Sequence, residues 1–201
     1  MNRRWLPLRS LAVLVPGGAV AAVVAGQTEP ETITEAVAPA RSGPLPVQAE
    51  GAPPVDVDQW LNTPGGKPVA VDGKVVLYEF WTFGCSNCQA VLPHVKAWYD
   101  RYADDGLVVV SVHTPEFDYE ADPDNIAEFV ADNDVRYPIA LDPDRTVWRA
   151  FENHYWPAFY LHDADGRRRL THFGEGSYDE TEDAIRELLG VDPSAPRAES
   201  V

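Results

Sequence analysis

Two apolar runs of strand length define the central part of the chain. Residues 74–81, KVVLYEFW, and residues 106–113, GLVVVSVH, are rich in β-branched and other apolar side chains. Such near-continuous runs are typical of strands buried on both faces, as in a parallel sheet. Between the two runs, apolar residues recur at helical spacing: Val91, Val95, Trp98 and Tyr102. The order strand, helix, strand predicts a right-handed parallel crossover.

The second half of the domain has a different pattern. The elements predicted there are a helix, a short helix, two strands and a last helix, at residues 123–133, 144–151, 158–163, 167–173 and 179–189. The turn ADG at residues 164–166 separates the two strands, which is typical of a hairpin. The whole pattern predicts an α/β fold with a mixed central sheet, in the order βαβ, an inserted helical segment, then ββα.

Composition divides the rest of the chain. Residues 27–54 are rich in Pro, Ala, Glu and Thr without helical or strand periodicity, which predicts an extended linker. Residues 191–201 have a similar composition and predict a disordered tail. One domain therefore remains, at residues 55–190, with enough apolar residues to fill a core.

Residues 1–26 have the pattern of an export signal or an N-terminal anchor. A basic segment containing Arg3 and Arg4 is followed by an apolar stretch from Leu11 to Ala25, which PGG interrupts. Fifteen residues are short for a bilayer span, which needs about 20. The Arg pair resembles a twin-arginine signal, and an ordinary basic leader explains it equally well. We therefore expect the domain to work outside the cytoplasm, where disulfides are stable.

The net charge of the chain argues against two classes of binding partner. The chain has 32 acidic against 16 basic residues and a formal net charge of −16. Such a surface repels nucleic acid and anionic lipid, so neither is expected as a partner. We expect the domain to be a monomer.

The two cysteines, Cys85 and Cys88, are the strongest chemical signal, because they are the chain's only cysteines and lie three residues apart. They stand where the first strand turns into a helix. The amide groups and dipole of a helix N-terminus stabilise a thiolate at Cys85. Cys88, one turn later and more covered, is placed to attack a mixed disulfide at Cys85. This arrangement favours a redox-active pair.

Three other uses of the pair are weaker. A zinc site needs two more ligands, and the nearest histidine, His94, points away from the pair in the predicted helix. Covalent haem needs a histidine directly after Cys88, where the chain has Gln89. A structural disulfide at this spacing closes too small a loop to add much stability. We therefore expect no metal and no cofactor beyond the Cys85–Cys88 disulfide.

The segment EFWTFGCSNCQAVLP, residues 79–93, resembles the active-site segment of the thioredoxin superfamily. Further segments, among them SVHTPEF, YWPAFYLHDADG and FGEGSYDETE, are similar to the extracytoplasmic TlpA type. The resemblance is greatest to the thioredoxin-like domain of DipZ-type proteins and covers about residues 56–190. It implies a thioredoxin fold and thiol-disulfide exchange.

The resemblance also implies roles for single residues. Cys85 matches the nucleophile, Cys88 the resolving thiol, and Glu79 the buried acid that helps to move the proton of the resolving thiol. A carboxyl in an apolar strand has a raised pKa, which suits this task; the alternative is that Glu79 points to solvent or pairs with a base. Pro157 matches the cis-proline that faces the disulfide, and Trp156 would offer its backbone to an extended substrate.

Three more residues lie near the predicted site. Trp81 matches the tryptophan packed beside the pair, where we expect it to take part in substrate binding, with a plain core position as the alternative. Gly84 stands where thioredoxins carry a second tryptophan, so we expect a more open approach to Cys85. His113 ends the second apolar run, where a hydrogen-bonded loop histidine is favoured over a substrate contact.

These observations predict an extracytoplasmic thiol-disulfide oxidoreductase. Its substrates would be protein thiols and disulfides, and its electron donor an extracytoplasmic protein that the sequence does not identify. Ser86 and Asn87, between the cysteines, carry no charge to stabilise the thiolate further, which favours a reductase or isomerase over an oxidase. The alternative is a non-catalytic binding module with a structural disulfide.

Overall fold

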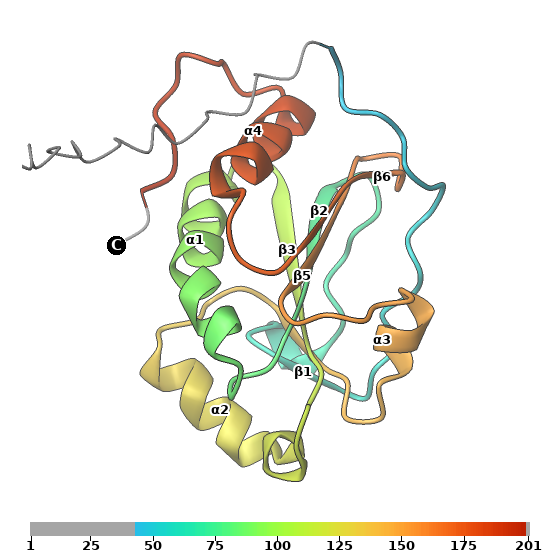
Figure 1. Ribbon diagram of the computed structural model, residues 1–201, viewed down its shortest axis with the longest axis vertical. Helices are drawn as coiled ribbons and strands as arrows, with labels where there is room; N and C mark the ends of the chain where they lie inside the picture. Colours follow the sequence, from blue (N-terminus) through green and yellow to red (C-terminus); the bar gives the residue numbers. More distant parts are fainter. Residues whose placement is uncertain (1–42, 200–201) are drawn as a thin grey trace, which may run out of the picture. The chain divides into compact units, whose positions relative to one another are not determined.

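The computed structural model describes residues 43–199, in which a central sheet has helices on both faces (Figure 1). The strands are β1 (Gln59–Leu61), β2 (Val75–Trp81), β3 (Leu107–His113), β4 (Ile139–Leu141), β5 (Ala158–His162) and β6 (Arg168–Phe173). The helices are α1 (Ser86–Tyr102), α2 (Pro123–Asp132), α3 (Thr146–Ala150) and α4 (Tyr178–Leu189), with 3-10 turns η1 (Pro64–Gly66) and η2 (Asp118–Ala121). Within this part of the chain, no helix has both the length and the apolar character needed to cross a membrane.

The sheet is mixed, with the strand order β1-β4-β3-β2-β5-β6. β2, β3 and β4 are parallel, whereas β5 runs antiparallel to β2, and β6 antiparallel to β5. This confirms the predicted crossover, the helical insert and the final hairpin with its helix. The pattern did not predict β1 and β4, because three residues are too few to show a period.

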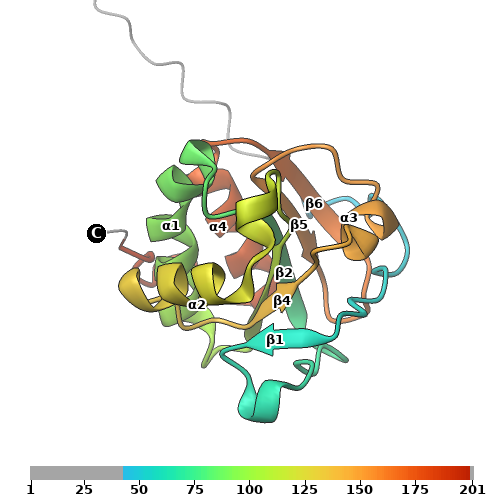
Figure 2. The ribbon, with the colours of Figure 1, turned by 90° about the horizontal axis from the view of Figure 1, so that it is seen from below.

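Alternation along the strands produces two cores, one on each face of the sheet. Val75, Leu77 and Trp81 of β2 pack toward α1 and α4, while Tyr78 and Phe80 pack in a second cluster. Figure 2 shows α1 and α4 on one side of the sheet and α3 on the other. All seven residues of β2 are buried, as predicted for a strand covered on both faces.

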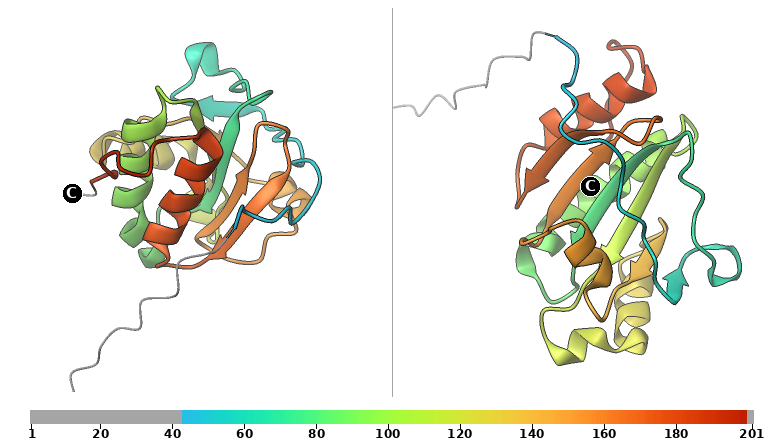
Figure 3. Two further views of the ribbon diagram at one scale, coloured as in Figure 1. Left: turned by 90° about the horizontal axis from the view of Figure 1, so that it is seen from above. Right: turned by 90° about the vertical axis from the view of Figure 1, so that its right-hand side faces the viewer.

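The segment before β1 belongs to the domain, in contrast to the prediction of a linker up to residue 54. It crosses the face of the sheet opposite α1 (Figure 3, right), where Ala52, Val55 and Val57 pack on the second core. Leu45 is only 2% exposed. Burial of apolar side chains stabilises an ordered segment that composition alone assigns to a tether.

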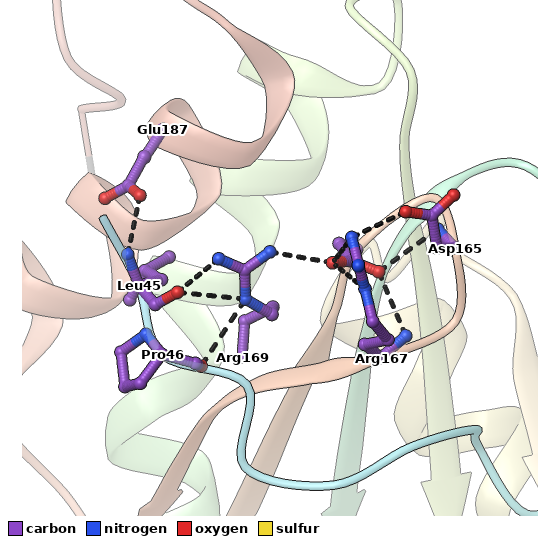
Figure 4. A network of polar contacts seen from close by, with 7 residues as sticks. Leu45, Pro46, Asp165, Arg167, Arg169 and Glu187 are labelled. Atoms are coloured by element: carbon purple, nitrogen blue, oxygen red, sulfur yellow. Dashed lines mark hydrogen bonds and ion pairs between the residues drawn. The ribbon is translucent and has the colours of Figure 1, made fainter.

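Polar contacts fix the start of this segment (Figure 4). The Leu45 N–H donates to Glu187 of α4 at 2.8 Å, and the Arg169 guanidinium donates to the Leu45 carbonyl. Arg169 also pairs with Asp163 at 2.7 Å. The predicted export segment and residues 27–42 lie outside the described residues.

The chain after α4 is also ordered as far as residue 199, which corrects the prediction of a disordered tail for that part. Arg186 of α4 is 5% exposed and donates to the carbonyls of four tail residues: Asp192, Pro193, Ala195 and Pro196. A buried guanidinium needs several acceptors, and the tail supplies them. The sequence pattern could not show this, because the tail has no periodicity.

Candidate active site

The two cysteines lie at the start of α1, directly after the loop 82–84 that follows β2. Cys85 is the N-cap of the helix, and the Cys88 N–H donates to its sulfur at 3.2 Å. Both side chains are free thiols; Cys85 is half-buried, whereas Cys88 is 2% exposed. The predicted placement at the strand-to-helix turn is therefore confirmed. An amide donor at a helix N-terminus stabilises negative charge on the accepting sulfur.

Cys88 has a less favourable environment for a thiolate. Burial, and then its hydrogen bond with Cys85, raise the pKa of the Cys88 thiol far above its ordinary value. The negative charge of nearby Glu79 acts in the same direction. Because Cys88 can react only as a thiolate, it needs a group that takes its proton.

Glu79 lies in the middle of β2, on the side of the sheet that α1 covers, and is 2% exposed. Its carboxylate accepts the Ser111 hydroxyl of β3 at 2.9 Å. Burial raises the pKa of Glu79 to about 7, and the Ser111 hydrogen bond opposes that shift. Glu79 therefore neither points to solvent nor pairs with a base, and it can exchange a proton near neutral pH.

Pro157 lies at the same edge of the sheet as the cysteine loop, because β5 starts opposite the end of β2, with Ala158 paired to Phe80. The Trp156–Pro157 peptide bond is cis, as the resemblance implied. The half-buried Trp156 donates its ring N–H to the Thr114 carbonyl at 3.0 Å and lies 4.1 Å from the Trp148 ring. The hydrogen bond and the ring contact fix the position of Trp156 beside Pro157.

Trp81 does not reach the surface. It is 3% exposed and meets the His113 ring edge-on at 5.0 Å. The structure therefore places it in the core beneath the site and not at a substrate-contacting position. The sequence could not distinguish these positions, because a tryptophan at a strand end suits both.

His113 holds the loop that leads to Cys85. Its Nε2 accepts the Phe83 N–H at 3.3 Å and lies 3.3 Å from the Thr82 hydroxyl. Burial lowers the pKa of His113 to about 4, so at neutral pH the ring is uncharged and one nitrogen can accept. The predicted hydrogen-bonding role of His113 is confirmed.

Gly84 does not open the approach to Cys85, which corrects the sequence expectation. A Cβ at this position would stand 2.1 Å from Glu120 Oε1 and 2.5 Å from the Tyr119 hydroxyl. The room that a tryptophan fills in thioredoxins is therefore occupied by η2. Sequence reasoning did not identify Tyr119 and Glu120 as neighbours of the site. The available signal was Gly84 itself, because a glycine in place of a large side chain indicates that another group fills the space.

Comparisons with known proteins agree with this site. The family model described as AhpC/TSA family matches residues 63–169. Protein DipZ of Mycobacterium tuberculosis is 50% identical over 133 residues, which cover 65% of this chain and 19% of DipZ. Thiol-disulfide oxidoreductase YkuV of Bacillus subtilis is 38% identical over 117 residues, covering 58% of this chain and 77% of YkuV. This chain thus spans about a fifth of the length of DipZ.

Solved structures support the same fold. The solution structure of a thioredoxin-like protein in the oxidized form matches with a TM-score of 0.63 and 31% identity, covering 72% of this chain and 98% of the other. The fold and the cysteine pair at the N-terminus of α1 define the class as thioredoxin-like proteins. Within this class, the chain belongs to the AhpC/TSA family.

Proposed function

We propose that this protein reduces or isomerises disulfide bonds of protein substrates outside the cytoplasm, with Cys85 as the nucleophile and Cys88 as the resolving thiol. The observation that carries the proposal is the asymmetry of the pair. Cys85 is half-exposed and receives an amide hydrogen bond, whereas Cys88 is buried near a carboxyl whose pKa is about 7.

The reaction has two exchange steps. First, the Cys85 thiolate attacks one substrate sulfur; a Cys85–substrate bond forms, the substrate disulfide breaks, and its second sulfur leaves as a thiolate. Next, Cys88 gives its proton to Glu79 and attacks the Cys85 sulfur. The Cys85–Cys88 bond forms, the mixed disulfide breaks, and the substrate has gained two electrons and, with two protons, two thiols. Here Glu79 acts as a general base.

Sequence features support the proposed direction, reduction of substrate disulfides, and the proposed location outside the cytoplasm. Ser86 and Asn87 offer no positive charge that would stabilise the reduced pair and so produce a strong oxidant. The leader-like residues 1–26 support export. To act again, the oxidised pair must accept two electrons from a dithiol donor, which we expect to be another extracytoplasmic protein.

Mixed-disulfide trapping tests the proposal. With Cys88→Ser, Cys85 attacks but nothing resolves the product, so covalent complexes with protein substrates should accumulate on non-reducing gels. With Cys85→Ser, no complexes should form, because Cys88 is buried. Equal trapping by the two variants would reject the assigned roles. No trapping by either would favour a binding module with a structural disulfide.

A further inference from the structure

Glu120 is a second acid buried beside the cysteine pair. It lies in η2, in the connection between β3 and α2, and is 0% exposed. Its Oε2 accepts the backbone N–H groups of Glu116 at 2.6 Å and Phe117 at 3.0 Å. A buried carboxylate is costly unless its oxygens are bonded, and these two amides supply the bonds.

The other oxygen of Glu120, Oε1, accepts the Tyr119 hydroxyl at 3.5 Å and faces the cysteine loop. Because a Cβ on Gly84 would stand only 2.1 Å from Oε1, this oxygen touches the backbone immediately before Cys85. Consecutive Cα atoms are about 3.8 Å apart, so Oε1 lies within roughly 7 Å of the Cys85 Cα. Only a glycine allows this approach.

Within the described part of the chain, no positive side chain pairs with Glu120. None of the ion pairs among residues 43–199 includes it. The nearby His113 is uncharged at neutral pH, because burial lowers its pKa to about 4. A charge in a buried, unpaired position acts on its neighbours with little screening by solvent.

We infer that Glu120 is a positioning residue that sets the redox equilibrium of the Cys85–Cys88 pair toward disulfide formation, because its buried carboxylate lies against Gly84. The inference rests on the proposed function and deepens it by naming a residue that makes the pair a reductant. A negative charge near Cys85 disfavours its thiolate and so the reduced pair. A less stable reduced pair gives up its electrons more readily.

A purely structural role for Glu120 predicts different behaviour. Its two amide bonds order the connection 116–120, and their loss would lower stability in any case. Stability alone does not change the balance between thiols and disulfide. The redox equilibrium is therefore the measurement that separates the two roles.

The test compares Glu120→Gln with Asp118→Asn in the full chain. Both substitutions remove one negative charge from η2, but Asp118 is exposed. In glutathione redox buffers at pH 7, we expect Glu120→Gln to raise the equilibrium constant for reduction of the disulfide roughly three- to tenfold. Asp118→Asn should leave it within about 1.5-fold of the parent, since exposed charges are screened.

Gly84→Ala provides a second route if Glu120→Gln does not fold. The added methyl displaces the carboxylate, whose end is flexible, without removing its charge. We expect the same direction of change, and melting curves identify which variants are folded.

An unchanged equilibrium constant in folded Glu120→Gln, or an equal rise in Asp118→Asn, would overturn the inference. Failure of the proposed function looks different: the parent disulfide would then resist reduction at every glutathione ratio, whatever residue stands at position 120.

Discussion

Two carboxyl groups are buried near the cysteine pair, and their hydrogen-bond donors differ. Glu79 lies in β2 below Cys88 and accepts a single hydroxyl, that of Ser111. Glu120 lies in η2 against Gly84 and accepts two backbone N–H groups and, at 3.5 Å, the Tyr119 hydroxyl. Backbone amides therefore bind one of the two acids, whereas Glu79 has only a side-chain donor.

The difference lies in what each donor can do. A hydroxyl can donate to a carboxylate or accept from a carboxylic acid, so Ser111 suits both protonation states of Glu79. A backbone N–H can only donate, so the amides around Glu120 always require an acceptor. Burial alone therefore does not define the role of an acid: the hydroxyl bonded to Glu79 is compatible with proton exchange, whereas the two amides fix the Glu120 carboxyl in place.

The largest expected effect is on the resolving step. Glu79→Gln keeps the volume but removes the base, so release of a thionitrobenzoate group from a preformed Cys85 mixed disulfide should slow roughly ten- to a hundredfold at pH 7. In the parent, Glu79 must be ionised to accept a proton, so the rate should rise with pH through about 7, the pKa of Glu79. In the variant this rise should be absent, with partial recovery at higher pH as Cys88 ionises unaided. Equal rates for both proteins from pH 6 to 9 would make Glu79 a bystander.

The next effect concerns stability. The folded-state pKa of Glu79 is raised from 4.5 to about 7, so its protonated form is favoured by folding. The stability it contributes is present below pH 4.5 and is lost as the pH rises to 7. The shift corresponds to roughly 3 kcal/mol at most, and imperfect bonding of the amide reduces this, so Glu79→Gln should gain about 2 kcal/mol relative to the parent at pH 8. Urea unfolding measures it; a gain as large at pH 4 would show that the cause is not ionisation.

The smallest expected effect concerns Glu120 and the resolving step. Glu120→Gln should change the rate of the resolving step at pH 7 by about two-fold or less, because Glu120 lies against the loop before Cys85 and not below Cys88. Its effect should add to that of Glu79→Gln in the double variant, as expected for groups that do not share partners. A tenfold slowing by Glu120→Gln alone would mean that both acids act on the same proton.

Part of this site could be predicted from the sequence. The apolar run around Glu79 indicated a buried strand, and the three-residue spacing placed Cys85 and Cys88 on the first turn of a helix. Both predictions were possible because each signal lies within a short stretch of sequence. The cis peptide bond before Pro157 was predicted only from the resemblance to the thioredoxin superfamily. The contact between Gly84 and Glu120 could not be predicted, because the two residues are far apart along the chain and no period relates them.

By itself, the sequence determined the elements with a local apolar pattern. These are β2 and β3, which are continuous apolar runs, and α1, the hairpin and α4. It also predicted where the cysteine pair lies, since the three-residue spacing at a helix start is local. Only the tertiary structure decided that residues 43–54 and 191–199 pack on the domain, that Trp81 is core, and that η2 fills the space at Gly84. These features depend on contacts between distant, non-periodic segments, whose geometry is set by the packing of the whole domain.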